Sequence, residues 1–360
     1  MGSWLAQFNL KPFRSLDEDE VIQIVSHALT HGSHSTSYKF GFFKSILDNL
    51  FNADISGDEE FLSYDLLASR FIEIYWNLIL HFRLRQMPKT SDNKRSLIGK
   101  LLEKFCTICN LDYSSGSVVF PFESLKYSYQ LELTSEAKGI MKKNVVAAFC
   151  GDTQNDFYHF DKRAGSTMDG ISFNHDAYIS LVKYKTSFEK LNYFEWIKYM
   201  EKVNEEEDAY ALATKLDAST ERTNLNAYRK VLESFGQTRC FYCGKILKKE
   251  EGLVVAETNI TFPKYRSVPV DHFIPWSFIK DDKIWNFVLA CEQCNSKKKD
   301  ILPSMDFVYN LEERNDKLSN FDNELVQKDF KDYAHFKIRH IYSSAVSNGF
   351  DCNWEPKKKS

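Results

Sequence analysis

The most informative stretch of the sequence is residues 240–303. It begins with Cys240-Phe-Tyr-Cys243 and, near its end, contains Cys291-Glu-Gln-Cys294. Each CxxC pair can turn both thiolates toward one point, and two pairs supply the four sulfur ligands of a closed tetrahedral zinc site. Forty-seven residues separate the two pairs, which is longer than in a compact zinc ribbon. We therefore predict a structural zinc site with a functional insert between its halves. Four unlinked core cysteines, or a redox CxxC, are the alternatives.

The insert contains a carboxylate and an imidazole side by side, Asp271 and His272. They follow the run Ser267-Val-Pro-Val270, whose composition indicates a strand, and Pro275 comes soon after them. Neighbours on a strand point to opposite faces, but the proline ring fixes φ and can bend the chain at a strand end. Such a bend would let both side chains share one small site. A capping Asp and a packed His are the structural alternative.

Two asparagines and a lysine run complete the pattern. Asn286 lies in a second candidate strand, and Asn295 directly follows the last cysteine, where a helix could begin. That helix would carry three consecutive lysines: Lys297, Lys298 and Lys299. Taken alone, either asparagine would be assigned an ordinary turn or cap role. Strand, strand and helix therefore form the minimal layout of this segment.

The pattern resembles the ββα-metal (HNH) endonuclease family in its zinc-knuckle form, over about 65 of the 360 residues. Asp271 matches the family's metal-binding carboxylate, and His272 matches its general base. Asn286, fifteen residues after Asp271, matches the middle Asn that braces the loop between the strands. Asn295, twenty-four residues after Asp271, matches the second metal ligand. The run from Asp271 to Ser277 is also similar to guide-RNA-directed nucleases and to related bacterial defence nucleases.

The residue types suit this chemistry. A hard cation at a carboxylate and an amide oxygen can offset the charge that builds when a phosphodiester is attacked. Oxygen ligands such as Asp271 and Asn295 favour Mg²⁺ or Mn²⁺ over zinc. His272 can take a proton from water near neutral pH, and the lysine run can contact flanking phosphates. We expect metal-dependent hydrolysis of DNA, and the resemblance implies 5′-phosphate and 3′-hydroxyl ends.

Charge is distributed unevenly along the chain. The net charge is −3, which excludes a protein that is basic throughout. Residues 221–303 carry 14 Lys and Arg against 10 Asp and Glu, whereas the remainder carries 33 against 40. The candidate nuclease segment is therefore the mildly basic part of the chain, as phosphate binding requires.

Cysteine usage and hydropathy bear on the compartment. Eight cysteines without a signal-peptide pattern indicate a reducing environment, with thiols free or bound to metal. The most apolar window, 71–80, is too short and too interrupted to span a bilayer. We predict a soluble, cytoplasmic protein without a membrane segment.

The rest of the chain predicts a mainly α protein in which the small α+β nuclease module is embedded. Helical spacing of apolar residues predicts helices at 21–30, 38–51, 64–84, 97–109, 171–203, 225–235, 305–318 and 325–346. Short strand-like pieces are predicted at 117–120 and 127–133, and a linker at 214–226. The predicted domains are a mainly helical N-terminal region (1–215), the HNH nuclease domain with its zinc knuckles (221–310) and a helical C-terminal extension (311–360).

Two other groups could bind metal. A third CxxC, at Cys106 and Cys109, lies within a helical pattern, and we interpret its cysteines as core residues rather than a second zinc site or a redox pair. Histidines at 27, 31 and 34, and His159 between aspartates, are interpreted as surface and loop residues.

The biological role implied by the resemblance is bacterial restriction or anti-phage defence. Two alternatives stay open. One is a catalytically inactive zinc-containing module that binds nucleic acid. The other is a nuclease subunit that acts only within a complex or after activation. In every case the N-terminal helical region is expected to supply recognition, regulation or a homo-oligomer contact, and in the second alternative it would be the surface for a protein partner.

Overall fold

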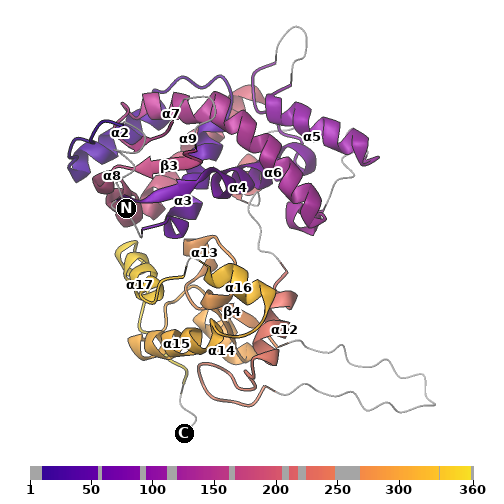
Figure 1. Ribbon diagram of the computed structural model, residues 1–360, viewed down its shortest axis with the longest axis vertical. Coiled ribbons are helices and arrows are strands. Elements are labelled where there is room, and N and C mark those ends of the chain that lie inside the picture. Colours follow the sequence, from indigo (N-terminus) through magenta and orange to yellow (C-terminus); the bar gives the residue numbers. More distant parts are fainter. Residues whose placement is uncertain are drawn as a thin grey trace. The chain divides into compact units, whose positions relative to one another are not determined.

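The computed structural model describes residues 10–55, 59–89, 95–111, 120–161, 167–204, 211–217, 224–247, 268–331 and 333–357. The chain divides into two compact units, Met1–Arg222 (the N-terminal unit) and Thr223–Ser360 (the C-terminal unit), both mainly helical (Figure 1). Parts of four predicted segments lie outside the described residues: 117–119, 218–223, 267 and 332. No helix in the described ranges is long and apolar enough to cross a membrane.

Helices make up most of the N-terminal unit. Its α-helices are α2 (Glu18–Thr30), α3 (Tyr38–Asn49), α4 (Tyr64–Trp76), α5 (Leu97–Ile108), α6 (Tyr127–Met141), α7 (Ala147–Asp152), α8 (His175–Lys183), α9 (Lys185–Val203) and α11 (Leu212–Asp217). Short 3₁₀ or π turns adjoin them at η1 (Leu50–Asn52), η2 (Asn77–His81), η3 (Phe122–Ser124) and η4 (Lys142–Val146). A three-stranded antiparallel sheet has the order β1 (Phe61–Ser63), β3 (Gly170–Phe173), β2 (Tyr158–His159).

Capping side chains explain where several of these helices begin. The Asp17 side chain accepts from the Glu20 backbone N–H, while the Glu20 side chain accepts from the Asp17 backbone N–H. Ser63 and Ser96 each accept a backbone N–H from the first turn of α4 and α5. These bonds satisfy N–H groups that have no partner within the helix. The helices predicted from residue 21 to residue 109 are confirmed as α2, α3, α4 and α5.

The core of the N-terminal unit is aromatic, and helix α4 contributes much of it. The Tyr75 ring centroid lies 4.7 Å from that of Phe71 and 5.3 Å from that of Tyr38. Gly41 of α3 permits this packing, because a Cβ there would lie 2.5 Å from the Tyr75 hydroxyl. Buried rings of this size dominate the energetics of a core, so the aromatic richness of the chain is used here for packing.

The strand-like segment predicted at 127–133 is wrong, because these residues form the first half of α6. Apolar residues alternate there, which favours a strand. In the structure Leu133, Ala137 and Met141 are buried one helical turn apart, whereas Tyr127 is exposed. Helix α6 lies along α4 (Figure 1). Packing against α4 therefore selects the helical period over the alternating one.

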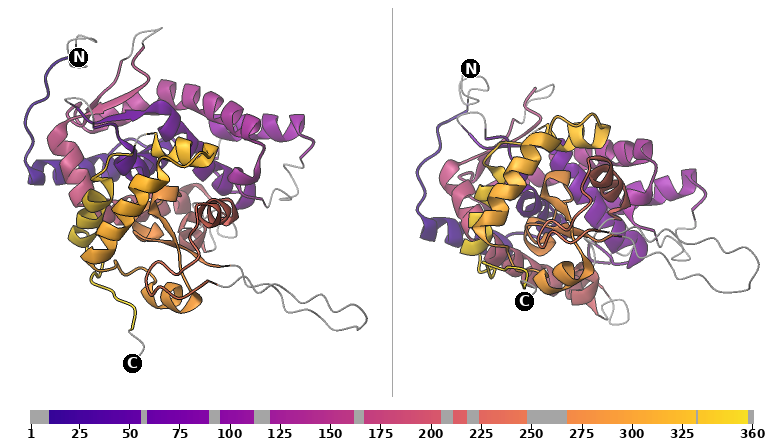
Figure 2. Two further views of the ribbon diagram at one scale, coloured as in Figure 1. Left: turned by 60° about the horizontal axis from the view of Figure 1, so that its bottom comes forward. Right: turned by 90° about the horizontal axis from the view of Figure 1, so that it is seen from below.

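The C-terminal unit contains a two-stranded antiparallel sheet of β4 (Val270–His272) and β5 (Phe287–Leu289). Its helices are α12 (Asn226–Ser234), α13 (Trp276–Ile279), α14 (Glu292–Lys298), α15 (Met305–Leu318), α16 (Glu324–Phe330) and α17 (Lys337–Ser347), with a 3₁₀ turn η6 (Ile284–Asn286) before β5. Figure 2 shows α17 beside α15 from two further sides. Along the chain, β4 is followed by α13, η6, β5 and α14.

Helices α15 and α16 bond to the backbone of β5 and of the η6 turn that precedes it. Arg314 of α15 is buried and donates to the carbonyl of Phe287 at 2.8 Å, and Asn315 donates to the carbonyl of Trp285 at 2.9 Å. Asp329 of α16 accepts from the backbone N–H of Ile284 at 2.8 Å. Because these bonds pair groups that would otherwise be buried without a partner, the C-terminal helices help to fix the position of β5.

Candidate active site and metal centre

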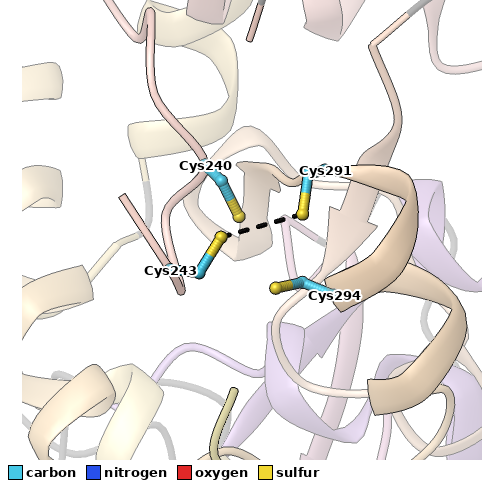
Figure 3. A group of neighbouring side chains, drawn as sticks. All are labelled: Cys240, Cys243, Cys291 and Cys294. Atoms are coloured by element: carbon cyan, nitrogen blue, oxygen red, sulfur yellow. Dashed lines mark hydrogen bonds between the residues drawn. The ribbon is translucent and has the colours of Figure 1, made fainter. Parts of the chain in front are cut away.

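Four cysteine side chains point toward one another in the C-terminal unit (Figure 3). The sulfur atoms of Cys240, Cys243, Cys291 and Cys294 all lie within 4.8 Å of one another, and the Cys243 and Cys291 sulfurs are 3.8 Å apart. Four sulfurs bound at 2.3 Å to one zinc ion in a tetrahedron would be about 3.8 Å apart. The cluster therefore has both the ligands and the dimensions of a structural zinc site.

Backbone hydrogen bonds fold the first CxxC into a tight loop. The Cys240 N–H donates to the Lys245 carbonyl at 2.8 Å, and the Gly244 N–H donates to the Cys240 carbonyl at 2.9 Å. Gly244 has a φ of +68°, in the left-handed region that favours glycine. The Phe241 N–H donates to the Leu289 carbonyl at 2.9 Å, which attaches this loop to β5.

The second CxxC lies at the start of α14, where Cys291 is the N-cap residue. Burial raises the pKa of the thiols of Cys240 and Cys294. A zinc ion would offset that cost because a coordinating thiol loses its proton. Clustered, largely buried thiols therefore fit a soft divalent cation.

The third CxxC has a different character. Cys106 is buried in α5 and Cys109 is half-buried at its end. Burial raises the pKa of the Cys106 thiol to about 11, so this thiol stays protonated at neutral pH. Within the described ranges, the four-cysteine cluster is the one group of three or more Cys, His, Asp or Glu side chains close enough to hold a metal ion.

Asp271 is buried and held at a single carboxylate oxygen. The Tyr242 hydroxyl donates to its Oδ2 at 2.5 Å, and the Lys298 ammonium lies 3.1 Å from the same atom. Burial raises the pKa of Tyr242 well above its usual value, and the Asp271 charge adds to this, so the hydroxyl remains a donor. Oδ1 makes no hydrogen bond to another residue that the structure describes.

His272 contacts a different set of groups. Its Nε2 lies 2.7 Å from Oδ1 of Asp282, and its ring packs edge-on against Phe287, the residue opposite it on β5. An ionised carboxylate can only accept, so in the neutral imidazole Nε2 carries the proton and Nδ1 keeps the lone pair. The polar contacts of the Asp271 and His272 side chains are therefore separate, because both residues lie within β4, where neighbours point to opposite faces, and the chain bends only after them.

Asn286 is fully buried and bonds to one residue of the segment that follows β4. Its side-chain oxygen accepts from the Ile274 N–H at 2.8 Å, and its amide donates to the Ile274 carbonyl at 2.9 Å. The Asn286 carbonyl also accepts from the Phe273 N–H at 2.8 Å. These three bonds tie the chain just after His272 to the start of β5.

The remaining predicted residues lie in helix α14 or, for Lys299, directly after it. Asn295 is half-buried and lies three residues before Lys298, so both lie on the same side of the helix. Lys297 and Lys299 are exposed. The prediction that Lys298 contacts phosphate from the surface is wrong, because its side chain is buried. Its ammonium reaches Asp271 and donates to the His272 carbonyl at 2.8 Å, since a buried charge needs a partner of opposite sign.

Two residues that contact this centre were missed from the sequence. Tyr242 lies between the two cysteines of the first CxxC, where an aromatic residue suggests only packing. Asp282 belongs to an Asp-Asp pair ten residues after His272, in a segment that has the composition of a surface turn. The spacing of a carboxylate from a histidine gives no indication of a contact unless the intervening fold is known.

The residue types of Asp271 and Asn295 also fit a hard divalent cation. Its Oδ1 and the amide oxygen of Asn295 are oxygen ligands of the kind that Mg²⁺ and Mn²⁺ prefer. Hydrogen bonds from Tyr242 and Lys298 to Oδ2 are typical of the outer contacts that orient a ligating carboxylate. Two protein ligands would leave positions for phosphate oxygens and water.

Comparison with known proteins identifies one region. Residues 240–304 match the family model of an HNH endonuclease domain. This range contains the four cysteines, both strands of the sheet and α14. The match indicates nuclease activity on nucleic acid. No curated protein and no solved structure gives a significant match to the chain.

Proposed function

We propose that this protein is a metal-dependent endonuclease that hydrolyses DNA phosphodiester bonds. The observation that carries the proposal is the pair of contacts at the end of β4. One ring nitrogen of His272 lies within hydrogen-bonding distance of Asp282. One carboxylate oxygen of its neighbour Asp271 is contacted by Tyr242 and Lys298, whereas the other makes no hydrogen bond to a described residue. Both lie in the range that matches an HNH endonuclease domain.

His272 acts as the general base. With Nε2–H bonded to Asp282, the Nδ1 lone pair is the one that can take a proton from an attacking water. Asp282 keeps the ring in this orientation and stabilises the imidazolium that forms. Asn286 holds the backbone just beyond the histidine, so that the ring and the strand keep a fixed relation.

Asp271 and Asn295 hold the catalytic divalent cation, Mg²⁺ or Mn²⁺. When bound there, the cation would offset the negative charge that builds on the phosphate and on the leaving oxygen. The exposed side chains of Lys297 and Lys299 contact flanking phosphates. Cys240, Cys243, Cys291 and Cys294 hold a structural zinc ion that staples a ββα-metal core.

The wider assignments follow from the family resemblance. DNA is the substrate, the products carry 5′-phosphate and 3′-hydroxyl ends, and the role is restriction or anti-phage defence in the cytoplasm of a bacterium. The N-terminal unit selects targets, regulates the nuclease or contacts a protein partner or a second copy of the chain.

The proposal is tested with the purified, zinc-loaded full chain. Supercoiled plasmid, linear duplex DNA, single-stranded DNA and RNA are incubated with Mg²⁺, Mn²⁺ or EDTA. Wild type is compared with Asp271→Ala and with Asp322→Ala, a matched control at an exposed carboxylate in the same unit. We expect nicking or linearisation of DNA that EDTA abolishes, that Asp271→Ala lacks and that Asp322→Ala retains.

Four outcomes would count against the proposal. Cleavage that persists in EDTA would show that the reaction needs no metal ion. Equal cleavage by Asp271→Ala and wild type would show that the Asp271 carboxylate is not required. Cleavage of RNA alone would change the substrate. No cleavage of any substrate would contradict a nuclease that acts by itself and would favour a subunit that needs a partner or an activating signal.

A further inference from the structure

One side chain from each half of the four-cysteine cluster contacts the same atom, Oδ2 of Asp271. Tyr242, between Cys240 and Cys243, donates to Oδ2 of Asp271 at 2.5 Å. Lys298, on the helix that carries Cys294, places its ammonium 3.1 Å from that oxygen. The cluster and the carboxylate are therefore connected by two independent side chains, one from each CxxC segment.

These contacts are shielded from water. Tyr242 is 6% exposed, Asp271 is 7% exposed and Lys298 is fully buried. Hydrogen bonds in which one partner is charged are strong when water is excluded. The Lys298 ammonium also donates to the His272 carbonyl at 2.8 Å, so α14 is bonded to both residues at the end of β4.

The geometry leaves the two oxygens of Asp271 with different roles. Oδ2 receives both the Tyr242 hydroxyl and the Lys298 ammonium, which fixes the rotation of the carboxylate about its side-chain bond. Oδ1 takes part in no hydrogen bond within the described part of the chain. A carboxylate held in this way offers one oriented oxygen to a cation.

We propose that Tyr242 is a positioning residue for the divalent-cation site, and that through it the cysteine cluster holds Asp271 ready to bind the cation. This inference rests on the proposed function, because it assigns the cation ligand to Asp271. Tyr242 itself touches neither substrate nor cation. Its hydroxyl sets the direction of the carboxylate, and the loop closed by Cys240 and Cys243 sets the position of the hydroxyl.

The test measures Mn²⁺ binding directly, apart from cleavage. Zinc-loaded wild type and Tyr242→Phe are titrated with Mn²⁺, free ion is followed by electron paramagnetic resonance, and zinc content is measured on the same samples. The matched control is Tyr342→Phe, which removes another buried hydroxyl of the C-terminal unit, one that donates to the Pro303 carbonyl. Cleavage as a function of Mg²⁺ concentration is measured in parallel.

We expect Tyr242→Phe to keep its zinc and to bind Mn²⁺ about 10- to 100-fold more weakly, the usual effect of losing a contact to a metal ligand. The Mg²⁺ concentration for half-maximal cleavage should rise correspondingly, while Tyr342→Phe stays at the wild-type value. Wild-type Mn²⁺ affinity in Tyr242→Phe would overturn the inference. Loss of zinc from this variant would also overturn it, because the hydroxyl would then support the cluster rather than Asp271.

Failure of the proposed function has a different result. In that case wild type itself would bind no Mn²⁺ outside the cysteine cluster and would cleave no substrate. If wild type binds and cleaves while Tyr242→Phe is unchanged, only the role of Tyr242 is wrong.

Discussion

Each unit buries charged side chains, but it pairs them differently. In the N-terminal unit Asp48 is buried, and Lys44 and Arg70 contact its two carboxylate oxygens. Arg70 is in turn bonded to Glu73. In the C-terminal unit the partners of Asp271 gather on one oxygen, and the other makes no hydrogen bond to a described residue.

The difference separates a structural ion pair from a candidate reaction centre. Burial opposes ionisation of Asp48, but Lys44 and Arg70 outweigh it and hold its pKa well below the usual range. Its charges are compensated within the fold, so no ligand is needed. At Asp271 a carboxylate oxygen remains, and a histidine follows it in the chain. A buried charge alone therefore does not indicate a functional site. A better indication is a buried carboxylate that lies next to a histidine and has one oxygen without a hydrogen bond to a described residue.

The largest effect should follow loss of the zinc cluster. Cys291→Ser removes one of the four ligands, and zinc ligation supplies on the order of 10 kcal/mol in small zinc domains. That is comparable to the whole free energy of unfolding of a typical domain, so we expect zinc loss and unfolding of the C-terminal unit, with the N-terminal unit protected. Zinc analysis and hydrogen exchange mapped along the chain provide the check.

The control for this variant is Cys352→Ser, at an exposed cysteine of the same unit. It should keep zinc and wild-type exchange. Full zinc content and an unchanged melting temperature in Cys291→Ser would show that the four cysteines do not form a stabilising zinc site.

The buried ion pair of the N-terminal unit can be tested by a substitution at Asp48. Asp48→Asn removes the buried charge that pairs with Lys44 and Arg70, which should destabilise the N-terminal unit by about 3 to 5 kcal/mol. Zinc content and protection of the C-terminal unit should not change. Thermal unfolding and hydrogen exchange of this variant, beside Asp19→Asn at an exposed site, measure the effect. A loss no larger than in Asp19→Asn would mean that the pair contributes little.

A smaller effect is expected at the carboxylate behind His272. Asp282→Asn replaces an obligate acceptor by an amide that can present its NH₂ to Nε2, so the ring loses its fixed tautomer. We expect the single-turnover cleavage rate to fall about 100-fold, the low end of what general acid–base catalysis contributes. Asp281→Asn, one residue away, is the control and should retain the wild-type rate. Equal rates for the two variants would show that Asp282 does not orient the histidine.

The smallest effect concerns Asp329, which joins α16 to η6. Burial raises its pKa to about 6, and Lys283 offsets this only in part. The folded state therefore binds this proton more tightly than the unfolded state, so the stability that protonated Asp329 contributes is fully present below about pH 4 and is lost as the pH rises through about 6. Asp329→Asn can still accept from Ile284 and should stabilise the C-terminal unit by roughly 2 kcal/mol at pH 7.5. The gain should disappear near pH 4.

Denaturation of this variant and of wild type at both pH values measures the difference. A gain that is the same at pH 4 and pH 7.5 would mean that the titration of Asp329 is not its cause.

The four-cysteine cluster could be predicted from sequence because each CxxC fixes two sulfurs locally, and few alternatives bring two such pairs together. Helix positions in the N-terminal unit could be predicted where capping residues and helical spacing agree. The first half of α6 could not, because its apolar residues alternate and only packing against α4 decides the period.

Contacts made by single side chains were harder to predict. Lys298 lies in a run of three lysines that has the composition of an exposed face, yet the turn of α14 directs it to Asp271. Asp282 and Tyr242 meet their partners across ten and twenty-nine residues. Such contacts depend on the path of the chain between β4 and β5 and on the loop of the first CxxC, and no local pattern encodes either.

The central claim is that His272 activates the nucleophile in a metal-dependent nuclease. It is tested most directly by single-turnover DNA cleavage in Mg²⁺ with wild type, His272→Ala and His335→Ala, an exposed histidine of the same unit. We predict that His272→Ala keeps its zinc and fold and loses about 10²- to 10⁴-fold in rate, the range for a general base, while His335→Ala cleaves normally. Equal rates for His272→Ala and wild type would contradict the claim.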